Sequence, residues 1–489
     1  MPKFDSSIVF LLFLHLLAVF LVSPTSAQAM LELPIDVNEV PHDLIPAPRT
    51  TILTSIPFFR NFIRAVRPSV HVGRKSDYRS DFDENYIIYH GAQLWKIIFN
   101  ATRRRSANIK RTETIQMFLD KFGAEVWNIN QDGIDVLIDY KNTAKAKDFI
   151  AKTDFTYNVM IDDIETAIDE TYTEVNNSNA DMPWLDRENS IMNWNRYHDI
   201  GDIQQFLQHI LETYPDMAEI VQIGLTHHKR PLEVLRLSNG NPDNWAVFLD
   251  AGLQARDWLS PAALTLAISK LTYLWDKESD YMRNIDWYFL PVANPDGYQF
   301  SRITDRLWAK NRYFDSKTGC YGVNLNRNFD YQWGGPGSSD NPCKNLYKGP
   351  KKFSEPESKA IRTFMLNMRE VMGAYVTFGA YGQAITYPWG DADFVTDNQR
   401  KLHTVARRAM LNFRKLNQAE YRIGTSYRLK LARAGNSADW VQQRINPQYV
   451  YNVFLKDQGR YGYLMPPHYI VESGEEAYEF MKTIAAALS

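Results

Sequence analysis

The stretch that decides the fold runs from Trp245 to Ala263 and reads W-A-V-F-L-D-A-G-L-Q-A-R-D-W-L-S-P-A-A. Its apolar run, Ala246–Leu249, predicts a buried strand. A turn follows at Asp250–Gly252, and Ser260-Pro261 is typical of the N-cap and first position of a helix. The stretch therefore predicts a buried strand that delivers polar side chains to a loop and a helix start.

On both sides of this stretch, apolar strands alternate with amphipathic helices. Helices are predicted from Asp202, as N-cap, to Tyr214 and over Pro261–Trp275. Further strands are predicted at Ala218–Ile223, Leu232–Leu237 and Trp287–Leu290. This alternation indicates an α/β fold with a largely buried mixed sheet that helices cover on both faces, over residues 193–489.

Several motifs of this region resemble those of the zinc metallocarboxypeptidases of the carboxypeptidase A/B type. The opening stretch is similar to the family's D-G-G-I-H-A-R-E-W-I-S-P-A, and Asp457–Gly462 is similar to D-x-G-R-Y-G. P-V-A-N-P-D-G-Y at Pro291–Tyr298 and C-Y-G-V-N-L-N-R-N-F-D at Cys320–Asp330 also match. The resemblance implies a carboxypeptidase-like mixed β-sheet and, in the family, zinc-dependent removal of C-terminal residues.

The resemblance also locates the family's three zinc ligands, and all three differ in this chain. Gln254 replaces the first histidine, Asp257 replaces the glutamate, and Gly379 replaces the second histidine. A Gln oxygen is a poor zinc ligand beside imidazole, and glycine has no side chain to donate. We predict no metal here and no cofactor.

Three further positions that resemble the family's catalytic positions have lost their chemistry. Phe454 replaces the general base, Ala309 replaces the arginine that stabilises the oxyanion, and Leu431 replaces the tyrosine that closes over the substrate. General base action contributes about two to four decades of rate, and a phenyl ring supplies none of it. We therefore predict an inactive member of the family.

Other residues that the resemblance implies for substrate binding are retained. Asn326 and Arg327 match the grip on the substrate's terminal carboxylate, which a guanidinium can pair with bidentately. Alternatively, these two residues only tie loops together. Ala438 at the base of the specificity pocket predicts an apolar C-terminal residue in the ligand. The groove is completed by Arg256, Arg306 and Tyr381.

The first 84 residues predict a leader and an extension. Residues 1–29 contain Lys3, the apolar run Ile8–Val22 and a small-residue A-Q-A pattern, which is typical of a cleaved signal peptide rather than a membrane anchor. Residues 30–84 lack a sustained apolar period and are predicted to be disordered. A cleaved signal peptide implies a secreted, extracellular protein.

Residues 85–170 predict a separate small α+β module. Strands are expected at Tyr86–Tyr89, Ile134–Ile138 and Tyr157–Ile161, with helices at Thr112–Phe122 and Thr143–Lys152. This β-α-β-α-β rhythm predicts an open sandwich. It resembles the ferredoxin-like activation domain of procarboxypeptidases.

The polar residues 171–192 are predicted to link the two modules. Arg187 is the only basic residue there and the natural place for a trypsin-like cut. Arg103–Arg105 is either a second processing site or an exposed basic loop. The sequons at Asn100 and Asn176 fit glycosylation of a secreted chain.

The remaining composition excludes some classes of partner. The net charge of −2 gives no electrostatic case for nucleic acid or an acidic membrane, and no later stretch is predicted to span a bilayer. Cys320 and Cys343 are the only cysteines, which favours a structural disulfide; their spacing also resembles that of the family's disulfide.

Two histidine motifs outside the motif positions are interpreted as structural. His209 and Glu212 share one face of a surface helix and predict a solvated pair. His227 and His228 fall in a predicted hairpin turn and are expected to be exposed rather than to bind metal.

These observations leave three hypotheses about function. In the first, the chain is a secreted carboxypeptidase-like pseudoenzyme that binds the C-termini of peptides or proteins. In the second, it is an active peptidase with rearranged ligands, or another hydrolase that uses Asp257. In the third, the small module is released near Arg187 and inhibits a related peptidase.

Overall fold

The computed structural model describes residues 86–98, 105–129, 133–175, 192–394, 396–431 and 433–489. The predicted signal peptide, the N-terminal extension, both sequons and Arg187 lie outside the described residues. None of the helices that the described residues form is long and apolar enough to cross a membrane.

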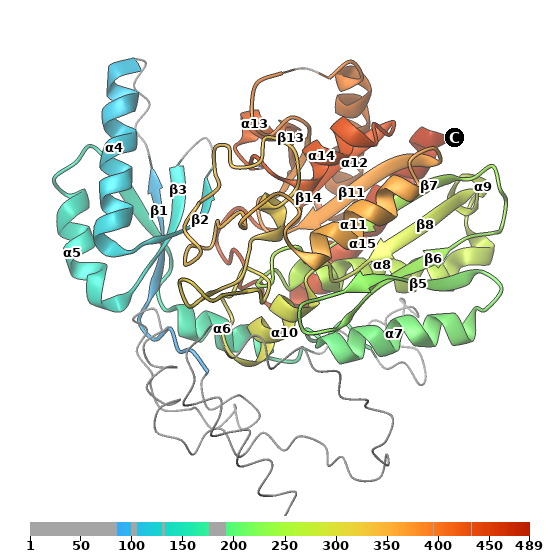
Figure 1. Ribbon diagram of the computed structural model, residues 1–489, viewed down its shortest axis with the longest axis horizontal. Coiled ribbons are helices and arrows are strands. Elements are labelled where there is room, and N and C mark those ends of the chain that lie inside the picture. The colour runs from blue at the N-terminus through green and yellow to red at the C-terminus, as the bar shows by residue number, and fades with distance from the viewer. Residues whose placement is uncertain (1–85, 99–104, 130–132, 176–191, 395, 432) are drawn as a thin grey trace, which may run out of the picture. The chain divides into compact units, whose positions relative to one another are not determined.

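The centre of the fold is an eight-stranded mixed sheet, here called the large sheet, with the order β13-β12-β14-β11-β7-β8-β6-β5 (Figure 1). The strands β14, β11, β7 and β8 run parallel, and β5, β6 and β12 supply the antiparallel pairs. The strands are β5 (Ala218–Leu225), β6 (Pro231–Leu237), β7 (Trp245–Asp250), β8 (Ile285–Leu290), β11 (Met372–Gly379), β12 (Ala384–Tyr387), β13 (Arg422–Thr425) and β14 (Tyr449–Phe454). The predicted mixed α/β sheet is confirmed.

Alternation along β7 shows how the two faces of the large sheet are covered. Val247 and Leu249 belong to the core shared with α7 (Ile200–Thr213), α8 (Leu259–Leu274), α12 (Gln399–Asn417) and α15 (Ile470–Leu488). Phe248 points the other way, into the core shared with α11 (Pro356–Asn367) and α14 (Ser437–Arg444). A strand has a side-chain period of two, so a continuous apolar run serves both faces.

The turn from β7 into α8 has the predicted layout, but the helix starts earlier than predicted. Gly252 has φ +66°, a left-handed conformation that glycine adopts without steric cost. The N-cap of α8 is Trp258, which makes no side-chain cap hydrogen bond. Ser260 already lies inside the helix, where its Oγ donates to Asp257 instead of capping.

The α7 helix shows a similar shift of its cap. Asp199 is the N-cap, and its Oδ1 accepts from the backbone N–H of Asp202 at 2.8 Å. Asp202 was predicted to be the cap but occupies the first turn. Two acidic residues three positions apart both suit a helix N-terminus, so the sequence pattern does not separate them.

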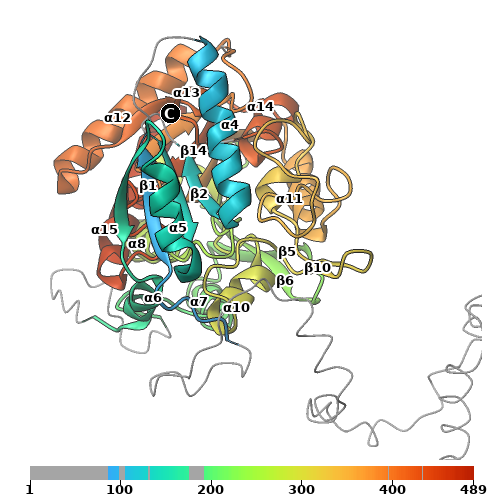
Figure 2. The same cartoon turned by 90° about the vertical axis from the view of Figure 1, so that its left-hand side faces the viewer.

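The small sheet is a separate four-stranded antiparallel sheet with the order β2-β3-β1-β4. Its elements are β1 (Gln93–Ile98), α4 (Arg105–Phe122), β2 (Glu125–Ile129), β3 (Gly133–Ile138), α5 (Tyr140–Ile150) and β4 (Thr156–Ile161). The helices α4 and α5 lie side by side over its strands (Figure 2). The predicted strand at Tyr86–Tyr89 is wrong, and β2 was missed.

Tyr86–Tyr89 is instead an extended segment that docks against the larger part of the fold. The Ile87 N–H donates to the Thr304 carbonyl, and the Tyr89 hydroxyl donates to Asp305 Oδ1 at 2.8 Å. Its apolar spacing therefore reflects packing between segments rather than pairing in the small sheet.

The two faces of the small sheet have different neighbours. Trp95, Val136 and Ile138 pack with α4 and α5. Leu94 and Leu137 point the other way and join the main core of the large sheet.

The remaining elements are α6 (Ile164–Tyr172), a short helix at Trp275–Lys277, α9 (Asp280–Arg283), α10 (Pro295–Ile303), β9 (Phe314–Asp315), β10 (Cys320–Tyr321), a short helix at Leu325–Arg327, α13 (Ser426–Leu429) and a short helix at Pro467–Tyr469.

The predicted disulfide is present. Cys320 and Cys343 are bonded, with a sequence separation of 23 and a Cα–Cα distance of 5.2 Å. It closes a loop that contains Arg327, one of the residues implied to hold a substrate carboxylate.

Candidate functional site

The three positions that correspond to the family's metal ligands come together at one edge of the large sheet. Gln254 and Asp257 lie in the loop after β7, and Gly379 is the last residue of the neighbouring strand β11. A Cβ placed on Gly379 would lie 3.8 Å from Asp257 Oδ2 and 3.9 Å from Phe454 Cδ1. These residues come together because β7 and β11 are parallel neighbours and end at the same side of the sheet.

Asp257 is held entirely by its own chain. Its Oδ1 accepts from the Ser260 N–H at 3.1 Å, and its Oδ2 accepts from Ser260 Oγ and the Ala380 N–H, each at 2.7 Å. Burial outweighs these hydrogen bonds and raises the pKa of Asp257 to about 6. The carboxylate is therefore satisfied without a cation.

The other residues of this site offer little for a metal. Gln254 Oε1 accepts from the Tyr463 hydroxyl at 3.1 Å, and Gly379 has no side chain. A zinc site needs three protein ligands, and here the glycine supplies none and the glutamine oxygen is a poor one beside imidazole. This set of residues does not fit a zinc ion.

Apolar side chains occupy the positions where the family has its proton-transfer and closing groups. Phe454 ends β14 and lies in register with Gly379. Leu431 lies near it, because a Cβ on Gly382 would be 3.2 Å from Phe454 Cβ and 3.4 Å from Leu431 Cδ2. Ala309 is buried and contributes only its backbone carbonyl, which accepts from the Ala255 N–H.

Asn326 and Arg327, which the resemblance implies for carboxylate binding, both form hydrogen bonds within the chain. Arg327 is 9% exposed, and its guanidinium donates to the Gly337 and Asn326 carbonyls at 2.8 and 2.6 Å. Asn326 Oδ1 accepts from the Ser437 N–H at 3.0 Å. Ala438 is fully buried one residue further along α14.

A second arginine, which the sequence interpretation missed, lies beside Arg327. Burial lowers the pKa of Arg327 to about 10, and repulsion from the Arg433 guanidinium contributes to this shift. Burial also lowers the pKa of Arg433 to about 10. Arg433 lies two residues after Leu431, so the loop carrying the lost tyrosine has gained a charge.

The small sheet reaches into the predicted groove with two carboxylates. Glu125 of β2 forms an ion pair with Arg256, and burial of that arginine is outweighed by Glu125, so the pKa of Arg256 is raised. Asp135 of β3 is fully buried and accepts from the Tyr381 hydroxyl at 2.8 Å. Two groove residues, Arg256 and Tyr381, are therefore engaged within the chain.

Arg306 lies behind the groove. It is fully buried, and it donates to the Arg256 and Tyr463 carbonyls at 2.8 and 2.7 Å. Its guanidinium also stacks on Trp258, with 3.6 Å to the ring centroid. In this arrangement Arg306 supports the loop after β7.

Comparison with known proteins adds the ancestry of this site. Residues 203–480 match a family model described as zinc carboxypeptidase, which covers more than half of the chain. The chain belongs to the zinc carboxypeptidase family. The resemblance found in its motifs is therefore confirmed, and it covers the whole region of the large sheet.

Individual relatives of this zinc carboxypeptidase family member agree with the assignment. The chain is 35% identical to carboxypeptidase B of Astacus astacus, over 60% of this chain and 97% of that protein. It is 31% identical to carboxypeptidase A2 of Mus musculus, over 73% of this chain and 84% of that protein. The solved structure of thrombin activatable fibrinolysis inhibitor is 26% identical, with a TM-score of 0.70, over 81% of this chain and 98% of that chain.

The two histidine motifs differ in outcome. His209 and Glu212 lie on α7, and Glu212 Oε1 accepts from Gln208. His227 was expected to be exposed, but only 28% of its side chain is exposed, and its Nε2 lies 2.8 Å from Glu355 Oε2. Glu355 is 128 residues away in sequence, so no local pattern could have indicated this contact.

Proposed function

We propose that this chain is a secreted, non-hydrolysing member of the zinc carboxypeptidase family that binds peptide C-termini. The observation that carries the proposal is the closure of Asp257 by donors from Ser260 and Ala380. Gln254 is a poor zinc ligand and Gly379 supplies none, so Asp257 alone would have to hold the ion. Without a metal, and with Phe454 and Ala309 at the catalytic positions, peptide hydrolysis has no general base and no fixed oxyanion charge.

Binding is supported by the two adjacent arginines. Arg327 and Arg433 repel each other in a largely buried setting. A carboxylate between them relieves this repulsion and accepts charge-assisted hydrogen bonds. The buried Ala438 supports an apolar C-terminal residue in the ligand.

The contacts of the small sheet support a groove that becomes open only when this sheet is removed. Glu125 and Asp135 engage Arg256 and Tyr381 in the intact chain. Cleavage near Arg187 would allow these carboxylates to leave. The proposal therefore places peptide binding after removal of the small sheet.

The proposal is tested on the full chain before and after trypsin-like cleavage. Calorimetry should detect binding of a peptide with a free C-terminal carboxylate only after cleavage, and amidation of that peptide should weaken binding at least about tenfold. Arg327→Ala should have a similar effect, while Arg428→Ala, which removes an exposed ion pair with Asp393, is the matched control. Equal binding of both peptides would contradict the proposal, and turnover with bound zinc would favour an active peptidase.

A second candidate function is favoured by the same contacts. The small sheet presents Glu125, Trp127 and Asp135 to a carboxypeptidase groove in this chain. Once released, it could dock in the groove of an active relative and inhibit it. Inhibition of such a relative by the cleaved fragment would support this role, whereas a secreted chain that stays full length in its native fluid would exclude it.

A further inference from the structure

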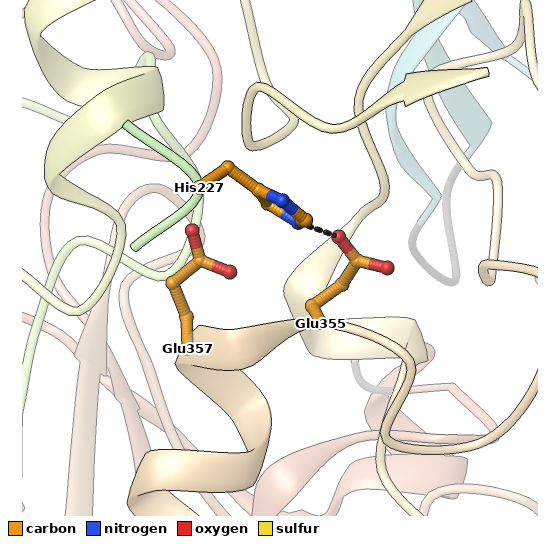
Figure 3. A group of neighbouring side chains, drawn as sticks. All are labelled: His227, Glu355 and Glu357. Carbon is orange, nitrogen blue, oxygen red and sulfur yellow. Dashed lines mark hydrogen bonds and ion pairs between the residues drawn. The ribbon is translucent and has the colours of Figure 1, made fainter. Parts of the chain in front are cut away.

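A second group of potential metal ligands lies outside the family's zinc position. It consists of His227 in the turn between β5 and β6, Glu355 at the N-cap of α11, and Glu357 in the first turn of that helix (Figure 3). One ligand atom from each side chain lies within 4.8 Å of the other two. The strand β8 separates β6 from β7, so this group is distinct from Gln254 and Asp257.

The hydrogen bonds of the group leave one buried oxygen without a donor. Glu355 Oε1 accepts from Ser354 Oγ at 2.6 Å, and its Oε2 accepts from Asn311 Nδ2 at 2.7 Å. Glu357 Oε2 accepts from the same Asn311 amide at 3.1 Å. Glu357 Oε1 has no partner among the described residues, although this side chain is fully buried. In Figure 3 the carboxylate of Glu357 faces the imidazole of His227.

The orientation of Asn311 is set by its other bonds. Its Oδ1 accepts from the Val323 N–H at 2.8 Å, so its amide nitrogen must face the two carboxylates. The two N–H groups of this amide donate to Glu355 Oε2 and Glu357 Oε2, so none is left for the remaining Glu357 oxygen. Among the described residues, Glu357 Oε1 therefore has no hydrogen-bond donor.

The charges of the group point the same way. Two carboxylates that are at most 1% exposed carry two negative charges, and the N-terminus of α11 offsets only about half of one charge. A divalent cation with a neutral imidazole would balance both carboxylates.

We infer that His227, Glu355 and Glu357 bind a divalent transition metal, for which zinc is the best match. One imidazole and two carboxylates are typical zinc ligands, and three protein ligands leave a fourth position for water. Tetrahedral zinc holds its ligand atoms about 3.3 Å apart, so the 2.8 Å contact between His227 and Glu355 widens slightly and Glu357 moves inward. The ion ties the β5–β6 turn to α11, and this inference does not depend on the proposed function.

The test uses the full chain stripped with a chelator and then equilibrated with zinc ions alone. Mass spectrometry should find about one zinc per chain, and zinc should raise the Tm of the stripped protein by several degrees. His227→Ala and Glu357→Gln should each weaken zinc affinity at least about tenfold and abolish the Tm shift. His228→Ala is the matched control. The His228 side chain neighbours His227 in sequence, but it is 52% exposed and its Nδ1 lies 4.0 Å from Asp296 Oδ1.

Each contrary result is informative. No zinc on the parent chain, or zinc that survives both His227→Ala and Glu357→Gln, would overturn the inference. Zinc that is lost in Asp257→Asn but kept in His227→Ala would place the metal at the family's position, and would overturn the proposed loss of zinc there as well. If His227→Ala does not fold, Glu357→Gln and the Tm shift of the parent chain still decide the question.

Discussion

Two groups of polar side chains lie at the same end of the large sheet, and they differ in the hydrogen-bond donors available to their oxygen atoms. Gln254 and Asp257 lie where the sequence resemblance predicts the family's metal ligands, and Tyr463, Ser260 and Ala380 donate to their oxygens. His227, Glu355 and Glu357 lie two strands away, where no ligand motif exists, and one Glu357 oxygen has no donor among the described residues. In this fold, the residues that a family motif predicts to bind a metal therefore differ from the residues whose arrangement suits a cation.

The largest effect is expected when the family's three zinc ligands are restored in the first group. Gln254→His, Asp257→Glu and Gly379→His together, in a His227→Ala background, should raise zinc affinity at that position by at least about a thousandfold. A side chain fits at Gly379, because its Cβ would meet only ordinary contacts of 3.8 to 4.0 Å. Zinc content and affinity are measured by mass spectrometry and chelator competition.

The single substitution Gln254→His is the control for this reconstruction and should bind no additional zinc. Hydrolysis should remain absent in the triple variant, because Phe454 and Ala309 are unchanged. A folded triple variant that binds no zinc would show that closure by Ser260 and Ala380, rather than ligand identity, excludes the metal.

Asp439 is another buried carboxylate with an oxygen that has no hydrogen-bond donor among the described residues, and it lies outside both groups. Asp439 Oδ2 accepts from Gly390 and Asn436, but its Oδ1 has no partner among the described residues, and burial raises its pKa to about 7. The folded state thus binds this proton more tightly than the unfolded state, whose pKa is about 3.9. The free energy of unfolding should fall as pH rises from about 4 to about 7.

Asp439→Asn should remove this part of the pH dependence, by up to about 4 kcal/mol between pH 4 and pH 8. Urea unfolding at several pH values measures it. The exposed Asp393→Asn is the control and should leave the profile unchanged. An identical profile for Asp439→Asn and the parent chain would show that Asp439 stays ionised when buried.

The ion pair between Arg256 and Glu125 connects the small sheet to the loop that carries the first group, and its contribution to stability can be measured. Glu125→Ala leaves a buried guanidinium unpaired and should lower the free energy of unfolding by about 3 kcal/mol. Glu219→Ala removes an exposed partner of Arg236 and should change it by less than about 1 kcal/mol. Chemical denaturation compares them, and equal effects would mean that the buried pair does not hold the small sheet in place.

The smallest expected effect concerns the donor that closes Asp257. Ser260→Ala removes the hydroxyl that donates to Asp257 Oδ2, while the Ala380 N–H remains. The loss should be about 1 to 2 kcal/mol in the free energy of unfolding. In an Asp257→Asn background the same change should cost less, and a neutral effect in both backgrounds would show that Ser260 does not stabilise the carboxylate.

Much of the fold could be predicted because burial leaves a clear pattern in the sequence. The apolar run in β7 serves cores on both faces of the large sheet, so its strand was evident. The start of α8 was predicted too late, because Trp258 takes the N-cap position without a capping side chain. Tyr86–Tyr89 was predicted to be a strand because it consists of apolar and aromatic residues, but this segment contacts the part of the fold around Asp305.

The site was predictable only where the family's motifs carry the positions. Gln254, Asp257 and Gly379 were located by motif, and the parallel strands bring them together. The contact of His227 with Glu355 spans 128 residues, and the proximity of Arg433 to Arg327 depends on how a loop folds back. Neither has a signature in local spacing, so neither could be inferred from the sequence.

The ion pair with Glu125 also determines how the groove looks to a distant ligand. While the small sheet is in place, Glu125 and Asp135 offset the positive charge of the groove. Without it, Arg256 would lose its ion-pair partner, and the field at the carboxyl ends of the central strands would become more positive. Such a field accelerates the encounter with anions, and the acceleration fades as the ionic strength rises and the Debye length falls to about 8 Å. Cleavage would then act as a switch on association rate, before any contact is made.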